Sequence, residues 1–170
     1  MMLVDKELKE LINSGTLIVE GYDSKNLGSV SYDLTIDKII SFAENDSIEH
    51  EHYELSGNEY IIIKTKEKLQ IPHNLLGKIE EKNSVMRMGL IVNGPCYQPG
   101  HETYAFLRVL NISKHNICLE SGFKIAQIMF EELKTIPEIT YDQKKDASFN
   151  NELKYRGFGN YEQDYMGKIL

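Results

Sequence analysis

Short stretches of alternating apolar and polar residues dominate this sequence, and this pattern is typical of β-strands. The alternation is clear in residues 29–36, where Tyr32, Leu34 and Ile36 recur at every second position. Turn-forming Asn, Pro and Gly residues separate most of the stretches. Many short strands with few helices predict a mainly β protein, built as a sandwich or barrel. The strands are expected at residues 16–22, 29–36, 60–65, 75–80, 90–92, 104–111 and 124–133.

A short helix is expected near the N-terminus. Leu8, Leu11 and Ile12 share one face of a 3.6-residue repeat, so they predict an amphipathic helix. Asp5 is the expected N-cap, and Ser14-Gly15 supplies the stop.

A second short helix is expected within residues 80–90. Asn83 or Ser84 is suited to cap one or two turns through Met88, and Gly89 suits the C-terminal position that tolerates positive φ. Arg87 lies one helical turn from the capping residues. Free backbone N–H groups, a hydroxyl and a guanidinium suit a phosphate. An ordinary capped helix with a surface arginine fits the same pattern.

Length and composition allow one domain with a tail. The 170 residues are 41% hydrophobic, which is enough for a single core. We expect this domain to span residues 1–133. Residues 134–170 are polar and weakly periodic, so they predict an extended C-terminal arm that either hangs free or closes over a ligand. The segment KYRGFGN, residues 154–160, carries two cations and an aromatic ring beside glycines and suits a lid.

Charge and cysteine content narrow the class of protein. The 26 acidic residues exceed the 19 Lys and Arg, giving a net charge of −7, so we expect no general affinity for nucleic acid or an anionic membrane. The charged N-terminus lacks an apolar run for a signal peptide or membrane span, and we expect a cytoplasmic protein. Cys96 and Cys118 suggest neither disulfides nor zinc and are expected to be small core or loop residues. His50 and His52 are expected in a solvated acidic loop, not as metal ligands.

The strand at 104–111 poses a problem of charge. Alternation puts Tyr104, Phe106, Arg108 and Leu110 on one face, and both faces look apolar. A buried, unpaired guanidinium would cost several kcal/mol. We therefore expect Arg108 to meet an acidic side chain or an anion from outside.

Five segments, taken in order, resemble the dCTP deaminase branch of the dCTP deaminase/dUTPase family. The resemblance runs from about Leu17 to Gly157 and implies a distorted, dUTPase-like β-barrel or jelly-roll. It also implies a homotrimer with sites at the subunit interfaces, Mg²⁺ bound through ligand phosphates without a protein metal site, and an arm that folds over the nucleotide. The segments are SVSYDLTI (29–36), EKNSVMRMGL (81–90), QPGHETYAFLRVLN (98–111), SGFKIAQIMFEEL (121–133) and LKYRG (153–157).

The resemblance also assigns site residues. Ser84 and Arg87 match family residues beside the phosphates, and Lys154 and Tyr155 match tail residues around the triphosphate. His101 stands where the family has an aromatic residue. The full set expected to contact the ligand is Lys82, Asn83, Ser84, Arg87, Gln98, His101, Arg108, Gln127, Lys154, Tyr155 and Arg156.

The catalytic positions depart from the family. The glutamate that shuttles protons in deamination is replaced by Arg108, which cannot act as a base near neutral pH, and the catalytic serine is replaced by Asn83. The aspartate that activates water in the dUTPase branch is replaced by Gln98, which puts diphosphate release in doubt. A shifted glutamate is a possible substitute for deamination: Glu102 on the hairpin, or Glu80 or Glu81 before the helix. The positions that face the base in the family are substituted here, whereas those that face the phosphates are retained.

Three functions remain open. The leading hypothesis is a trimeric protein that binds or sequesters a phosphorylated nucleotide, or a nucleotide-like signal, without deaminating dCTP. A divergent active dCTP deaminase, with or without diphosphate release, is the first alternative. The second is a protein-binding scaffold in which Arg108 forms a salt bridge with Glu80, Glu81 or Glu102. The sequence names neither the base nor the number of phosphates, and its many Lys, Asn and Ile residues are compatible with a low-GC genome such as that of a phage.

Overall fold

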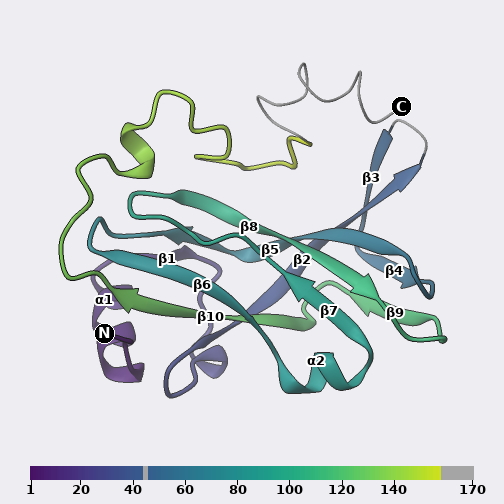
Figure 1. The fold of residues 1–170 in the computed structure, drawn as a ribbon. Coiled ribbons are helices and arrows are strands. Elements are labelled where there is room, and N and C mark those ends of the chain that lie inside the picture. Colours follow the sequence, from purple (N-terminus) through teal and green to yellow (C-terminus); the bar gives the residue numbers. More distant parts are fainter. Residues whose placement is uncertain (44–45, 158–170) are drawn as a thin grey trace.

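The computed structural model describes residues 1–43 and 46–157, and within them the protein is mainly β (Figure 1). Two α-helices and two short 3₁₀ segments accompany the strands. The helical elements are α1 (Asp5–Asn13), η1 (Ser24–Asn26), α2 (Asn83–Arg87) and η2 (Tyr141–Gln143). The strands are β1 (Leu17–Glu20), β2 (Tyr32–Ala43), β3 (Asp46–His50), β4 (His52–Leu55), β5 (Tyr60–Gln70), β6 (Leu75–Glu81), β7 (Leu90–Asn93), β8 (Glu102–Asn111), β9 (Ile117–Glu120) and β10 (Lys124–Glu132).

The main sheet is antiparallel and curls on itself. Its strand order is β6-β10-β2-β5-β8-β7, with β1 added against β5 and β3 against β2. The two ends of this order come together because β6 contacts β7, and Gly77 and Tyr97 exchange backbone hydrogen bonds of 2.9 Å. The result is the nearly closed, distorted barrel that the sequence predicts. A separate pair, β4-β9, lies beside it.

Alternation along the central strands places one side of each in the core. On β8, Thr103, Ala105, Leu107, Val109 and Asn111 are buried, while the residues between them are half-buried or exposed. Strand β5 follows the same two-residue period. Branched and aromatic side chains favour such half-buried pleated surfaces, so period and composition point to the same face.

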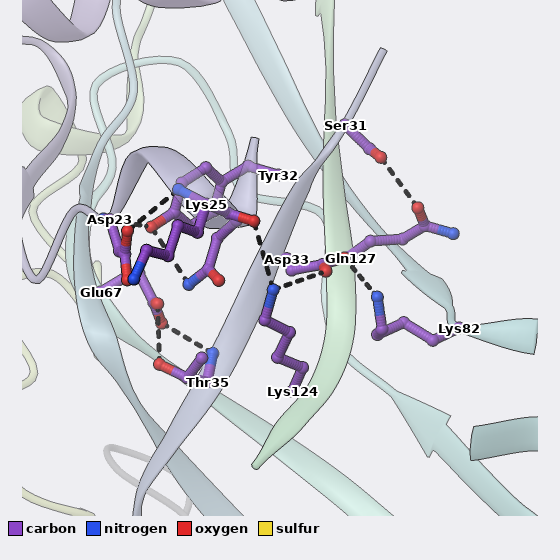
Figure 2. A network of polar contacts seen from close by, with 11 residues as sticks. Asp23, Lys25, Ser31, Tyr32, Asp33, Thr35, Glu67, Lys82, Lys124 and Gln127 are labelled. Atoms are coloured by element: carbon purple, nitrogen blue, oxygen red, sulfur yellow. Dashed lines mark hydrogen bonds and ion pairs between the residues drawn. The ribbon is translucent and has the colours of Figure 1, made fainter. Parts of the chain in front are cut away.

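One acidic side chain lies inside this core. Glu67 is fully buried at an irregular point in β5, where the register with β8 shifts. Thr35 donates to its carboxylate from the backbone N–H (2.9 Å) and from the hydroxyl (2.8 Å), as Figure 2 shows. Burial raises the pKa of Glu67. Because its oxygens are hydrogen-bonded, Glu67 links β2 to β5.

The N-terminal helix forms where predicted, but its N-cap is Val4, not Asp5. The Val4 N–H donates to Glu7 Oε2 at 2.9 Å, so the glutamate satisfies a free donor without help from Asp5, which is already helical. Leu8 is buried as expected. The helix ends at Asn13 with Ser14 as its C-cap, and Gly15 follows with a φ of +81°.

Three strands were not predicted: β3, β4 and β9. Their outer positions carry charged or polar residues, which makes them resemble loops in the sequence. His50 and His52 therefore lie on strands and not in an acidic loop. His50 is half-buried, with Nε2 2.9 Å from Ser41 Oγ. Cys96 lies in the loop after β7, which is one of the two expected placements, whereas Cys118 is exposed on β9 and lies neither in the core nor in a loop.

The described part of the C-terminal arm, residues 134–157, runs over β8 (Figure 1). Backbone hydrogen bonds attach it at two places: Tyr141 N–H to the carbonyl oxygen of Pro99, and Asn151 N–H to that of Glu102, both at 2.7 Å. The arm thus closes over part of its own barrel. Residues 158–160 of the predicted lid lie outside the described residues, and the boundary at residue 133 stays a prediction.

Candidate functional site

Helix α2 carries the residues predicted to bind phosphate. Its N-cap is Lys82, whose side chain makes no capping bond, so the predicted cap at Asn83 or Ser84 is wrong. Lys82 still has the extended backbone of the preceding strand, and Asn83 is already helical. Ser84 and Arg87 are exposed, and Arg87 Nε donates to Asn83 Oδ1 at 3.1 Å. A serine hydroxyl and a guanidinium therefore lie on one exposed turn.

Lys82 and Gln127 bond to neighbouring strands (Figure 2). Lys82 Nζ forms an ion pair with Asp33 on β2. Gln127 Nε2 donates to the Glu81 carbonyl oxygen at 3.0 Å, and its Oε1 accepts from Ser31 Oγ at 2.8 Å. Both predicted ligand contacts thus have partners within the chain and fasten β2, β6 and β10 together beside α2.

Arg108 is exposed, which contradicts the expectation of a guanidinium enclosed between apolar faces. The outer face of β8 is covered near Phe106, where the ring of Tyr155 packs at 5.9 Å, but not at residue 108. Arg108 Nη2 donates to Asn93 Oδ1 at 3.1 Å. Because water solvates the side chain, neither an internal acid nor an external anion is required. Within residues 1–43 and 46–157, no acidic side chain pairs with it, so the salt bridge of the scaffold hypothesis is not formed.

A cavity of about 370 Å³ lies between β8 and the C-terminal segment. This volume is in the range of small-molecule sites, about 300–1,000 Å³. Cys96, Gln98 and Thr103 contribute to the lining, which is otherwise mostly aromatic. The aromatic residues are Tyr97, Tyr104, Phe106, Tyr141, Phe149 and Tyr155. Such a lining favours a flat ring.

Tyr97, His101 and Glu152 are buried, titratable side chains that line this cavity. His101 Nε2 donates to the Phe149 carbonyl oxygen at 2.9 Å, and burial lowers the pKa of the ring, so His101 is neutral with Nδ1 as an acceptor. His101 Nδ1 and the Tyr97 hydroxyl have no hydrogen-bond partner among the described residues. Burial also raises the pKa of Tyr97, as does the nearby Glu152. Glu152 is itself 5% exposed, and burial raises the pKa of its carboxyl group.

The tail residues matched by the resemblance take different positions. Tyr155 lines the cavity, and its ring lies 5.9 Å from the rings of Phe42 and Phe106. Arg156 donates to two backbone carbonyl oxygens of the C-terminal segment, at 3.1 and 3.2 Å. Lys154 is exposed. Of the three, Tyr155 alone contributes to the cavity.

Gln98 and Glu102 are both engaged by lysines. Gln98 Oε1 accepts from Lys144 Nζ at 3.1 Å, and Gln98 lines the cavity. Glu102, the predicted substitute carboxylate, pairs with Lys68 at 2.6 Å and lies outside the cavity lining. Glu102 is therefore poorly placed for chemistry in this cavity.

The structure brings some of the predicted residues together and separates others. Gln98, His101 and Tyr155 share the cavity. Asn83, Ser84, Arg87 and Arg108 do not line it, and α2 lies on the opposite side of the barrel from the C-terminal segment (Figure 1). Within one chain, the residues predicted to bind phosphate and the residues that line the aromatic cavity therefore lie on separate surfaces.

Sequence reasoning missed Tyr97 and Glu152. Tyr97 precedes the Pro99-Gly100 turn, and its buried position could have been read from the hairpin pattern. Glu152 lies in a polar, weakly periodic segment, and no local signal distinguishes it from the exposed acids around it. Its burial depends on how the arm packs over β8.

A sequence profile described as dCTP deaminase-like matches residues 2–133. The chain belongs to the dCTP deaminase-like family. The dCTP deaminase, dUMP-forming, of Corynebacterium glutamicum strain R is 25% identical and aligns over 92% of both chains. This alignment covers more of the chain than the profile match does.

Solved structures support the fold of a dCTP deaminase-like protein. The 2'-deoxycytidine 5'-triphosphate deaminase of Agrobacterium tumefaciens superposes with a TM-score of 0.63 at 16% identity, over 77% of this chain and 48% of that one. The present chain thus spans about half the length of the Agrobacterium protein. The dUTPase of Staphylococcus bacteriophage 80alpha gives a TM-score of 0.51 at 17% identity, over 71% and 85% of the two chains. The barrel is therefore of the dUTPase-like type.

Among the described residues, no group of three or more His, Cys, Asp or Glu side chains is arranged to hold a metal ion. None of the helices in this part of the chain has the length and apolar character that a membrane span requires.

Proposed function

We propose that this protein is a dCTP deaminase, which converts dCTP and water into dUTP and ammonia. The observation that carries this proposal is the alignment over 92% of both chains with a relative of that named activity. The aromatic cavity supports it because a pyrimidine is a flat ring with hydrogen-bonding edges. This proposal replaces the binding-only hypothesis as the leading one.

In this proposal, the two surfaces bind different parts of the nucleotide. Exposed Ser84 and Arg87 on α2 bind the triphosphate, since a guanidinium forms strong charge-assisted bonds with phosphate oxygens. Mg²⁺ is expected to bind through the phosphates. The cavity beside β8 holds the base. Because one chain keeps these surfaces apart, we propose a homotrimer in which α2 of one subunit completes the cavity of the next.

We expect dUTP, and not dUMP, to be the product. The relative's name includes formation of dUMP, which requires a second hydrolysis that releases diphosphate. The residue expected to activate water for that step is Gln98 here, and a side-chain amide is not a base. Deamination is then the single reaction that we expect. Its substrate, dCTP, would come from the nucleotides of the cytoplasm.

A second candidate is a nucleotide-binding protein without deaminase activity. The observation that favours it is Arg108, which occupies the position of the family's proton-shuttling glutamate and cannot take up a proton near neutral pH. This candidate predicts ligand binding without turnover.

One experiment separates the two candidates. The full chain is incubated with dCTP and Mg²⁺, ammonia is measured, and the nucleotides are resolved by anion-exchange chromatography. Equal amounts of ammonia and dUTP support the deaminase. Thermal stabilisation by dCTP without ammonia supports the binding protein, since a ligand at 100 times its Kd stabilises by about 2.7 kcal/mol. If dCTP causes neither ammonia release nor thermal stabilisation, both candidates are contradicted.

A further inference from the structure

We propose that Glu152, on the C-terminal segment, is the catalytic residue that transfers protons in this reaction, replacing the glutamate that β8 lacks at position 108. The inference rests on the proposed deaminase function and adds a residue that lies outside the family's matched segment, residues 2–133. It also assigns the cavity between β8 and residues 134–157 as the place where the ring reacts.

Glu152 is the single carboxylic acid among the described residues that line the cavity. The other candidate, Glu102, is paired with Lys68 and lies outside the lining. Arg108 is exposed and does not line the cavity either. A general acid or base must be within reach of the proton that it moves. Placement in the cavity therefore selects Glu152.

The backbone around Glu152 is fixed to the barrel. Asn151 N–H donates to the Glu102 carbonyl oxygen at 2.7 Å, and Asn150 Oδ1 accepts from the Glu102 N–H at 3.0 Å. The Glu152 side chain is oriented by the Arg156 N–H, which donates to Oε1 at 2.9 Å. A catalytic carboxyl group needs such support, because misplacement of a reacting group is costly.

Two aromatic side chains of the cavity suit a flat ring. Tyr97 and His101 both line the cavity, and their rings lie 5.5 Å apart. The Tyr97 hydroxyl and His101 Nδ1 are themselves buried in the cavity wall. What the two residues offer a ligand is therefore their ring surface, which favours stacking with a pyrimidine.

The protonation behaviour of Glu152 suits this role. Burial raises the pKa of its carboxyl group, while the Arg156 N–H and guanidinium act in the opposite direction. The titratable groups that interact with it are Tyr97 and Tyr155, and its negative charge raises the pKa of both. A carboxyl group shifted toward neutral pH exchanges protons in both directions more readily than an ordinary surface glutamate.

The step balances with water as the second reactant. The water oxygen bonds to C4 of the ring while the Glu152 carboxylate takes one water proton and delivers it to N3. Glu152 then takes the remaining hydroxyl proton and passes it to the amine. The C4–N bond breaks, ammonia leaves, and the C4=O double bond forms. Glu152 returns to its starting state, and dUTP and ammonia are the products without any redox change.

The test is ammonia release by wild type, Glu152→Gln, Glu152→Asp and the matched control Glu138→Gln, which changes an exposed acid of the same segment. Loss of general acid/base catalysis lowers kcat by about 10²–10⁴-fold. We expect this loss in Glu152→Gln with KM nearly unchanged, partial activity in Glu152→Asp, and wild-type activity in the control. The lower-pH limb of the kcat profile should be absent from the residual activity of Glu152→Gln.

The outcomes separate this inference from the proposed function. Wild type that releases ammonia, with Glu152→Gln above a tenth of its rate, overturns the role of Glu152 and leaves the deaminase intact. Wild type that releases no ammonia overturns both. Circular dichroism checks the fold of each variant. If Glu152→Gln does not fold, the same criteria apply to Glu152→Asp, whose shorter carboxyl should lower kcat by at least tenfold.

Cysteine labelling tests the cavity independently of turnover. Cys96 lines the cavity and is exposed, whereas Cys118 is exposed on β9, outside the lining. We expect dCTP to slow the reaction of Cys96 with a thiol reagent in the Cys118→Ser variant, and to leave Cys118 unprotected in Cys96→Ser. Equal labelling of Cys96 with and without saturating dCTP would place the ring elsewhere and overturn the assignment.

Discussion

Three charged residues show how burial decides what a side chain can do. Arg108 is exposed and solvated, so its charge requires no partner. Glu67 and Glu152 are buried, and burial raises the pKa of both. Two hydrogen bonds from Thr35 occupy Glu67, whereas Glu152 faces a cavity. The first therefore has a structural role, and the second is available for chemistry.

The raised pKa of Glu67 predicts a pH-dependent stability. The unfolded glutamate releases its proton near its ordinary value of 4.5, while the folded one keeps it to higher pH. Its stabilisation is therefore present below pH 4.5 and is lost as the pH rises through the folded pKa. Urea unfolding between pH 4 and 8 should show that wild type loses stability relative to Glu67→Gln, by about 1.4 kcal/mol per unit of pKa shift. Parallel curves for the two proteins would contradict this role.

At the level of elements, α2 is a short turn fixed between β6 and β7. The helix ends at Arg87, and Gly89, just beyond its C-cap, has a φ of +84°. A Cβ atom there would lie 2.8 Å from Ser113 Cβ, so the loop after β8 packs directly on the end of the helix. The positions of Ser84 and Arg87 therefore depend on a close backbone approach.

Gly89→Ala should destabilise the protein by about 1–3 kcal/mol, because alanine is strained at this φ and also clashes. Gly15→Ala is the matched control: its φ is +81°, but a Cβ atom meets nothing within 4 Å. We expect a smaller loss for the control in urea unfolding. Equal losses would mean that the packing against Ser113 is unimportant.

The sequence predicts elements best where burial is one-sided. The alternation of 29–36 and 104–111 identifies β2 and β8, because every second residue enters the core. Strands β3, β4 and β9 escape the same reasoning because each has only four or five residues, which is too short for a clear repeat among charged neighbours. The two N-caps were misassigned because propensity does not reveal which residue first becomes helical.

The candidate site was predictable only in part. Ser84, Arg87, His101 and Tyr155 follow from the resemblance, since their neighbours carry recognisable patterns. The exposure of Arg108 and the burial of Glu152 do not, because each depends on where the arm crosses β8. The local sequence of a segment without a periodic pattern does not reveal where that segment packs on the rest of the chain.

For the whole molecule, the barrel and the arm together define the site. The barrel supplies β8 and the hairpin at Tyr97, and the arm supplies Glu152 and Tyr155. The phosphate-type residues of α2 lie on the opposite side of the same chain (Figure 1). The proposed site, which uses both kinds of group, therefore combines residues from two copies of the chain in our proposal.

We predict a homotrimer in solution. Light scattering should give a mass three times the 19.6 kDa of the chain. Mixing Arg87→Ala with Glu152→Gln chains under conditions of subunit exchange should restore part of the activity, because some interfaces then combine an intact α2 with an intact cavity. A monomeric mass, or no restoration in exchanged trimers, would contradict the shared site.

Single-turnover ammonia release from dCTP, with enzyme in excess and Mg²⁺ present, tests the central claim most directly, because it detects slow chemistry without waiting for product release. The account predicts that all bound dCTP becomes dUTP with one equivalent of ammonia, and that Glu152→Gln slows this single turnover by about 10²–10⁴-fold. Bound dCTP that stays unchanged in the wild-type protein would contradict the account.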